Sequence, residues 1–391
     1  MNKRVLSAII IILLIFAAYV SINNPQLNSI ALYIAMPLAF GLSIVQYGNP
    51  LAGNKYVKIL FLLYCWIGIT YFGAYHQLAA AAQMKEILGV ILLSTVFANL
   101  AKNPRSIPWL YIVYIVLYIG AIKYAQTNLL NIIGEDERAS DDILNANTLA
   151  YYTFYLSCAI YILGDCIQHK LPRKIMRYLF WGIIILSGWI ALITASRQVL
   201  LIQIPLYLLF LIIRYGLGKN KYRFYIILCA GFVWLLSTNT VGSIFEGSLL
   251  QERYEYKLED DDRTLVLQEA IDVGNSNPIV GVGPGNFVYY SKYHIFSHCT
   301  YTELYANCGL VAVIIYVVIL LYFVITQFKR YKNSRDIMYL FFLIFGIFFA
   351  VDNFFYVFYS EIWLMSFFIL VASHSETYYR LKQVRKNPIY G

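Results

Sequence analysis

Three residues of this 391-residue chain combine a chemically useful side chain with a position at the edge of an apolar run. Arg197 lies in the short stretch 194–198 between two apolar runs, and Arg263 opens a stretch with helical periodicity. His298 stands just before the apolar run that begins near Thr302. Arginine offers a planar fork of donors that suits phosphate oxygens, and helix N-termini also favour anions. A histidine near a helix N-terminus tends to stay neutral, as a general base must be. The three residues predict a site that binds a phosphate group and supplies a base.

Each of these residues also has a structural explanation. Arg197 could extend to lipid headgroups, and Arg263 follows three aspartates with which it could form ion pairs. His298 could be a structural histidine, and His294, four residues earlier, competes for any role as a base. The aspartates at 260–262 could hold a divalent cation, but acidic runs are usually solvated, so no metal site is predicted.

The composition indicates a membrane protein. A soluble domain is about 45–50% apolar and about 25% charged, whereas this chain is 60% hydrophobic and 13% charged, with a mean hydropathy of +0.63. The six cysteines include no C-x-x-C pair, so neither a disulfide framework nor a zinc site is predicted. The net charge of +9 alone would suggest nucleic acid, but in a membrane protein the position of the basic residues relative to the bilayer matters, and we predict no nucleic-acid partner.

Apolar runs long enough to cross a bilayer recur along the whole chain. We expect an all-α polytopic membrane protein with about twelve transmembrane helices, forming one membrane domain over residues 1–391. The runs lie near Val5–Val20, Ser29–Val45, Val57–Tyr75, Glu86–Leu100, Pro108–Tyr124, Leu149–Leu163, Tyr178–Ile193, Val199–Ile213, Phe224–Thr238, Thr302–Ile325, Met338–Val357 and Glu361–Ser373.

The distribution of lysine and arginine predicts the orientation, because short cytoplasmic loops are enriched in these residues. With the N-terminus inside, the inner segments hold 22 of the 30 basic residues. These segments are 3–4, 55–58, 102–105, 170–177, 214–223, 329–335 and 380–386. Both termini are therefore expected in the cytoplasm, and Arg197, Arg263 and His298 on the outer side.

One outer connection, between the ninth and tenth runs, is far longer than the usual helix connection. This large extracytoplasmic loop spans about residues 241–300, and a short surface helix is expected over Asp262–Gly274. The glycine-rich stretch 281–286 lacks the ending of a phosphate-binding loop and is interpreted as a turn. Thr300 and Glu303 have capping-box spacing, so a helix is expected to begin at Thr300 and to leave His298 just outside.

Taken together, motifs within residues 190–325 resemble the superfamily of O-antigen ligases and Wzy-type polysaccharide polymerases of bacterial envelopes. The matching stretches are Thr194-Ala195-Ser196-Arg197, Arg263 followed by Leu265–Ala270, Asn277–Phe287, His298–Leu304 and Asn307–Leu310. Cys299 departs from the Asn or Ser that often follows the histidine, which affects a secondary hydrogen bond only.

The resemblance implies glycosyl transfer on the outer face of the bacterial cytoplasmic membrane, from an undecaprenyl-diphosphate-linked glycan to an acceptor hydroxyl. By this resemblance Arg197 and Arg263 bind the diphosphate, His298 is the base and Glu303 orients the site, with His294 as a second supporting candidate. Direct attack by the acceptor inverts the anomeric centre, and two arginines take the place of a metal. No cofactor is expected, and flippase and chain-length regulator proteins are implied partners beside the membrane lipid.

Three functions remain open from the sequence. A polymerase would join repeat units into O-antigen, capsule or exopolysaccharide, and is favoured because nothing in the chain indicates a terminal acceptor. A ligase would move a finished glycan to lipid A-core or another acceptor. A polysaccharide or solute transporter is disfavoured, because transporters carry charged residues at the membrane midplane and repeated halves, neither of which is evident in the sequence.

Overall fold

The computed structural model describes most of the chain. The described residues are 3–23, 25–48, 54–128, 146–167, 169–193, 203, 207–209, 222 and 262–386. Every regular element within these ranges is helical, so the expected all-α class is confirmed. Arg197, most of the expected runs Val199–Ile213 and Phe224–Thr238, and the first part of the expected large loop lie outside the described residues.

Ten of the expected apolar runs fall on described helices. These are α1 (Lys3–Asn23), α2 (Pro25–Ile30), the π-helix η1 (Ala31–Ala35), α3 (Met36–Tyr47), α4 (Lys55–Tyr71), α5 (Gln77–Leu100), α6 (Ile107–Asn128), α7 (Ala146–Cys166), α8 (Lys170–Ile193), α15 (Thr300–Ser334), α16 (Ile337–Asp352) and α17 (Ile362–Lys386). The second run is divided among α2, η1 and α3. Pro37 follows η1 and lacks the N–H that a regular helix needs, which explains the π-helical turn.

By length and composition, five described helical stretches are suited to crossing a membrane. They are Lys3–Ser21, Leu27–Tyr47, Gln77–Leu100, Ile107–Thr127 and Thr300–Ser334. Two shorter helices lie within the stretch that contains the predicted site, α13 (Asp262–Ser276) and α14 (Phe287–Tyr290). The helix expected over Asp262–Gly274 therefore exists and is two residues longer.

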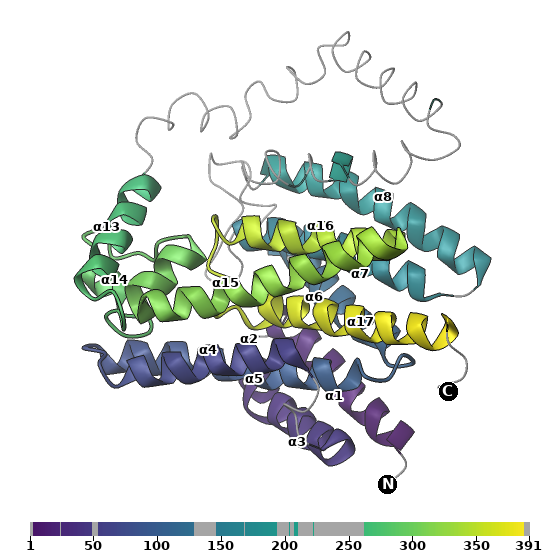
Figure 1. Ribbon diagram of the computed structural model, residues 1–391, viewed down its shortest axis with the longest axis horizontal. Helices are drawn as coiled ribbons and strands as arrows, with labels where there is room; N and C mark the ends of the chain where they lie inside the picture. The colour runs from purple at the N-terminus through teal and green to yellow at the C-terminus, as the bar shows by residue number, and fades with distance from the viewer. Residues whose placement is uncertain are drawn as a thin grey trace. The chain divides into compact units, whose positions relative to one another are not determined.

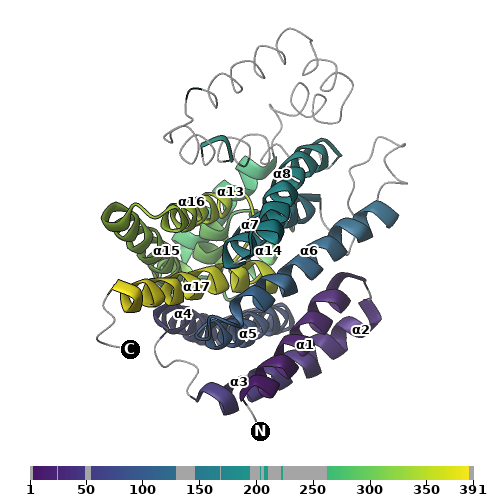
Figure 2. The ribbon, with the colours of Figure 1, turned by 90° about the vertical axis from the view of Figure 1, so that its right-hand side faces the viewer.

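The chain divides into two compact units, one made of Met1–Tyr114 with Asp262–Gly391 and the other of Ile115–Asp261. In the first unit α5 packs along α17, α4 packs on both α5 and α15, and α1 pairs with α3 (Figures 1 and 2). In the second unit α7 packs against α8, where the Thr153 and Ser187 hydroxyls lie 3.3 Å apart.

The two ends of the first unit differ in chemistry. At one end lie α13, α14 and the connections 72–76 and 353–361, as Figure 1 shows for the green helices. At the other end Arg330 pairs with Glu376 at 2.8 Å and Lys382 with Asp336 at 3.0 Å. Among the predicted site residues, Arg263, His298 and Glu303 therefore lie at the end opposite these basic residues.

Candidate functional site

Helix α13 is fixed to the start of α15 by a small apolar core. Val266 and Ala270 of α13 pack with Phe287 of α14 and Ala306 of α15, and all four side chains are fully buried. Tyr305 closes the far end of this contact by donating its hydroxyl to Asn275 Oδ1 at 2.9 Å. The packing joins the helix that carries Arg263 to the helix that follows His298.

Helix α15 is broken at Gly309, which has φ 75° and ψ 179°. A helix break leaves backbone groups without intrahelical partners. The loop 277–286 supplies donors for two of these carbonyls. Val282 N–H donates to Ala306 O at 2.9 Å, and Gly283 N–H donates to Asn307 O at 2.8 Å.

Two further hydrogen bonds satisfy backbone groups beside Gly309. Leu310 N–H donates to Pro278 O at 2.8 Å, and Trp66 of α4 donates its indole N–H to Cys308 O at 2.9 Å. The tenth apolar run, expected as one continuous span from Thr302, is therefore two helical segments joined through a docked loop.

The glycines of loop 277–286 serve this docking. Gly281 has φ 67°, and a side chain there would overlap the Asn307 backbone. A side chain at Gly309 would likewise overlap the Ile279 carbonyl. The stretch forms turns, as interpreted from its sequence, and its glycines allow backbone to approach backbone.

Asn286 links this loop to the connection between α4 and α5. Its side chain is fully buried, its Oδ1 accepts the His76 N–H at 2.7 Å, and its Nδ2 donates to Pro284 O at 3.0 Å. The His76 ring also stacks on Tyr289 of α14, with ring centroids 3.8 Å apart. The α4–α5 connection and the continuous stretch 277–290, which are far apart in the sequence, are thus held together beside the start of α15.

Glu303 connects the first turn of α15 to the segment that carries His298. Its carboxylate is only 4% exposed, and it accepts the Ser297 N–H at 2.7 Å through Oε2. Its Oε1 accepts Asn307 Nδ2 at 2.8 Å, and Asn307 Oδ1 in turn accepts the Phe287 N–H at 2.8 Å. One buried carboxylate therefore orders both the approach to α15 and the start of α14.

His298 is half-buried, one residue after this anchored N–H. Its φ of 56° is in the left-handed region, which few residues other than glycine adopt, although histidine does so more often than most. Its ring lies 4.2 Å from the Phe296 ring, centroid to centroid. The flanking residues are held by hydrogen bonds within Ser297–Thr302, including Thr302 Oγ1 to Ser297 Oγ at 3.0 Å.

Helix α15 begins at Thr300, as expected, and His298 lies outside it. The expected capping box is wrong, because Cys299 is the N-cap residue and makes no capping side-chain hydrogen bond. Thr300 instead donates its hydroxyl to Tyr356 O and accepts the Phe358 N–H, both at 2.8 Å. Its hydroxyl therefore fixes the helix to the connection between α16 and α17.

The remaining predicted residues take separate places. Arg263 is half-buried in the first turn of α13, one turn before the core residue Val266. His294 is exposed, has φ 52°, and its Nδ1 lies 3.2 Å from Val288 O. The structure thus joins Glu303 to the His298 segment and secures the helix bearing Arg263 beside it.

Several organising residues were not predicted from the sequence. Asn307 lies four residues after Glu303, a spacing that places two side chains on one helix face and is the only sequence signal for their contact. Glu269 of α13 accepts hydrogen bonds from Ser291 Oγ at 2.7 Å and Lys292 N at 3.2 Å, and no motif indicates this role.

The arrangement offers an imidazole at an ordered helix entrance and a guanidinium on an adjoining helix. Within the described ranges, no three His, Cys, Asp or Glu side chains gather as ligands of a metal ion would. Comparison with known proteins adds no family assignment: no protein-family model matches the chain, and no curated protein matches it significantly.

Proposed function

We propose that the protein polymerises undecaprenyl-diphosphate-linked oligosaccharide repeat units into O-antigen, capsule or exopolysaccharide on the outer face of the bacterial cytoplasmic membrane. In this reaction the acceptor hydroxyl attacks the anomeric carbon of the donor sugar, and the bond to the diphosphate breaks. His298 takes the proton of the hydroxyl, and Arg197 and Arg263 bind the leaving diphosphate. The order of these residues along the chain supports the proposal.

The observation that carries the proposal is the anchoring of the His298 segment by the buried Glu303 carboxylate. A general base must be held within hydrogen-bond reach of the proton it removes. The Ser297 N–H to Glu303 contact at 2.7 Å fixes the backbone directly before His298. A base that lies just before a helix needs a backbone fixed in this way.

The position of Arg263 also supports the proposal. It lies at the N-terminal turn of α13, where backbone N–H groups and the helix dipole favour an anion. The apolar core of Val266, Ala270, Phe287 and Ala306 fixes this turn relative to α15. An arginine held in this way suits a diphosphate, because its planar donors match phosphate oxygens.

The test is to replace His298 with Ala in the native host and to separate the surface glycans on a gel. Loss of a general base typically costs roughly 10²- to 10⁴-fold in rate. We expect the ladder to collapse to a single repeat on the normal acceptor. The companion variant His294→Ala tests the competing histidine, which is exposed and has a similar left-handed backbone, and it is expected to keep the ladder.

Other outcomes separate the competing functions. Long chains stranded on undecaprenyl diphosphate would identify a ligase instead. An unchanged ladder in a His298→Ala protein that is still inserted in the membrane would refute His298 as the base. Solute flux into proteoliposomes that is independent of His298 would then favour a transporter.

A further inference from the structure

The end of the first unit opposite the candidate site contains a pocket of about 810 Å³. It lies among the start of α1, the end of α3 and the turn between α5 and α6, all within residues 1–114. We call its cations the basic mouth: Lys3, Arg4 and Arg105. We call its large apolar side chains the apolar wall: Ile11, Ile12, Ile15 and Trp109. None of the 13 described residues that line the pocket is acidic.

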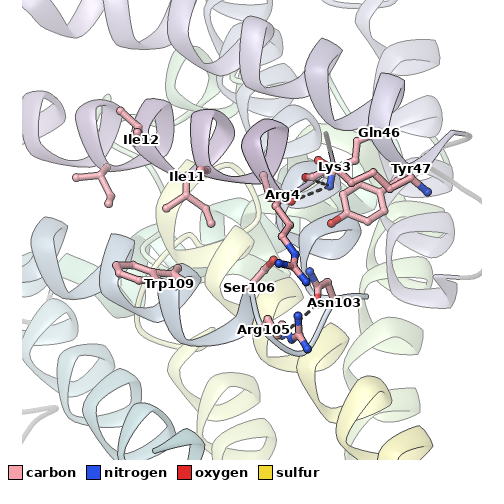
Figure 3. Close-up of a pocket in the computed structure, with 13 residues that line it drawn as sticks. Lys3, Arg4, Ile11, Ile12, Gln46, Tyr47, Asn103, Arg105, Ser106 and Trp109 are labelled. Atoms are coloured by element: carbon pink, nitrogen blue, oxygen red, sulfur yellow. Dashed lines mark hydrogen bonds between the residues drawn. The ribbon is translucent and has the colours of Figure 1, made fainter. Parts of the chain in front are cut away.

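The pocket is arranged along α1, as Figure 3 shows. Arg4 points toward Ser106 and Asn103 at the mouth, whereas Ile11, Ile12 and Trp109 lie further along the helices. The helical rise from Lys3 to Ile15 is about 18 Å, at 1.5 Å per residue. A bilayer has a hydrocarbon core of about 30 Å, so the pocket has the depth of one leaflet.

Polar atoms at the mouth indicate a polar ligand. Gln46 donates through Nε2 to Ser7 Oγ at 2.7 Å and to Lys3 O at 3.0 Å. Its Oε1 and the Tyr47 hydroxyl oxygen are buried without a hydrogen-bond partner among the residues that the structure describes. Buried polar atoms normally have partners, and a headgroup with hydroxyl and phosphate oxygens offers acceptors and donors for both.

The wall identifies the rest of the ligand as apolar. Ile12 is 64% exposed and Trp109 is 53% exposed, and they border the same pocket as the three cations. A free phosphate would use the mouth and leave the wall without a function. A neutral or zwitterionic lipid carries no net negative charge to match the three cations of the basic mouth.

We propose that this pocket binds one anionic phospholipid, with its phosphate in the basic mouth and an acyl chain along the apolar wall. The basic end is the end expected to face the cytoplasm, where the leaflet surface carries negative charge. The site is separate from the proposed glycosyl transfer, and it binds lipid whether or not that proposal holds. Its role is to anchor the N-terminal helix pair to α6.

The experiment uses the purified full-length protein in detergent and measures lipid binding by native mass spectrometry. Phosphatidylglycerol and phosphatidylcholine with identical chains are titrated separately. We expect phosphatidylglycerol to bind at least about tenfold more tightly, because basic residues near a lipid surface attract anionic headgroups.

The variant Lys3→Gln/Arg4→Gln/Arg105→Gln removes the basic mouth and is expected to reduce phosphatidylglycerol binding to the phosphatidylcholine level. The matched control carries the same charge change on exposed residues at the end of α15 and is expected to bind like the wild type. It is Lys329→Gln/Lys332→Gln/Arg335→Gln. Equal phosphatidylglycerol affinity in the two triple variants would overturn the proposal.

Two further measurements complete the test. Ala8→Trp fills the pocket from an exposed position without changing charge, and it is expected to reduce lipid binding even if the triple variant does not fold. Retention of full binding in this variant would overturn the proposal. Millimolar inorganic phosphate should not displace the lipid, and displacement would reveal a site for free anions instead.

Discussion

The Glu303 carboxylate accepts the backbone N–H of Ser297 at 2.7 Å, and His298 lies between these two residues in the sequence. The bond joins the first turn of α15 to the segment before it, and the same carboxylate accepts Asn307 Nδ2 at 2.8 Å. The carboxylate is therefore a positioning group for the histidine, and the predictions below test the bonds that surround it.

Replacing Glu303 with Gln is expected to lower the stability of the protein by about 1–3 kcal/mol, the usual cost of a buried unsatisfied donor. The glutamine amide presents an N–H₂ group toward one of the two N–H donors that the carboxylate now satisfies. Thermal unfolding followed by tryptophan fluorescence measures the change.

The control for this substitution is Asp272→Asn, which makes the same change of charge on an exposed residue of α13. Surface substitutions usually change stability by less than about 0.5 kcal/mol. Equal unfolding temperatures for the two variants would contradict the positioning role of Glu303. A loss of glycan polymer in Glu303→Gln alone would connect the role to activity.

Gly309→Ala is expected to destabilise the protein by more than about 2 kcal/mol, because alanine at φ 75° is strained and its Cβ would overlap Ile279. Gly41→Ala provides the comparison. Gly41 lies inside α3, and a Cβ there meets no atom within 4 Å, so alanine should be neutral or stabilising by up to about 1 kcal/mol. Similar effects at both glycines, measured by thermal unfolding, would rule out the tight docking of the loop.

Asn286→Asp is expected to loosen the contact between loop 277–286 and the α4–α5 connection. Aspartate keeps the acceptor for the His76 N–H but cannot donate to Pro284 O, and it places a charge in a buried position. Hydrogen exchange should become faster in residues 72–76 and 284–290. Exchange that rises equally throughout the protein would indicate general destabilisation instead of a local tie.

The stability of the α16 N-terminus is expected to fall in acid. Asp336 accepts the Met338 N–H at 3.0 Å, and Lys382 lies 3.0 Å from its other oxygen. Burial alone would raise the pKa of this carboxyl, but these two donors and the Tyr378 hydroxyl hold the pKa below its usual value. The carboxylate therefore stabilises the fold fully above the ordinary Asp pKa of about 3.9. This stabilisation is lost as the pH falls through the lower, folded-state pKa.

The measurement is the unfolding temperature of the wild type and of Asp336→Asn between neutral pH and pH 3. Asparagine keeps the helix cap, so the comparison isolates the charge. The difference between the two proteins should be largest at neutral pH and shrink in acid. A difference that stays constant over this range would show that the ion pair with Lys382 contributes nothing.

The length of the apolar runs predicted most of the described helices but not how they end or break. The run expected from Thr302 to Ile325 continues to Ser334 as α15. Its last turns contain lysine and arginine, so they remain helical but are not part of an apolar run. The break at Gly309 could not be predicted, since a glycine within an apolar run is usually tolerated. Its cause is the docking of loop 277–286, a contact that no local pattern encodes.

Part of the local structure around the candidate site was predicted. The family resemblance implied a supporting role for Glu303, which remains a prediction. Spacing placed His298 just outside the helix that begins at Thr300, where the structure also has it. It assigned the wrong bond to Glu303, because a capping box pairs the glutamate with Thr300, whereas the structure pairs it with Ser297 N–H. Backbone donors carry no sequence signature, so this partner could only be found in three dimensions.

The order in which the chain is synthesised favours the docking of loop 277–286. Residues 277–286 leave the ribosome before Gly309 does, so the N–H groups of Val282 and Gly283 exist before the carbonyls that accept them. The backbone groups freed at Gly309 therefore meet partners that have already been synthesised. The break at Gly309 therefore does not have to wait in apolar surroundings for a later part of the chain, although Thr300 at the start of α15 is joined to the later connection 353–361.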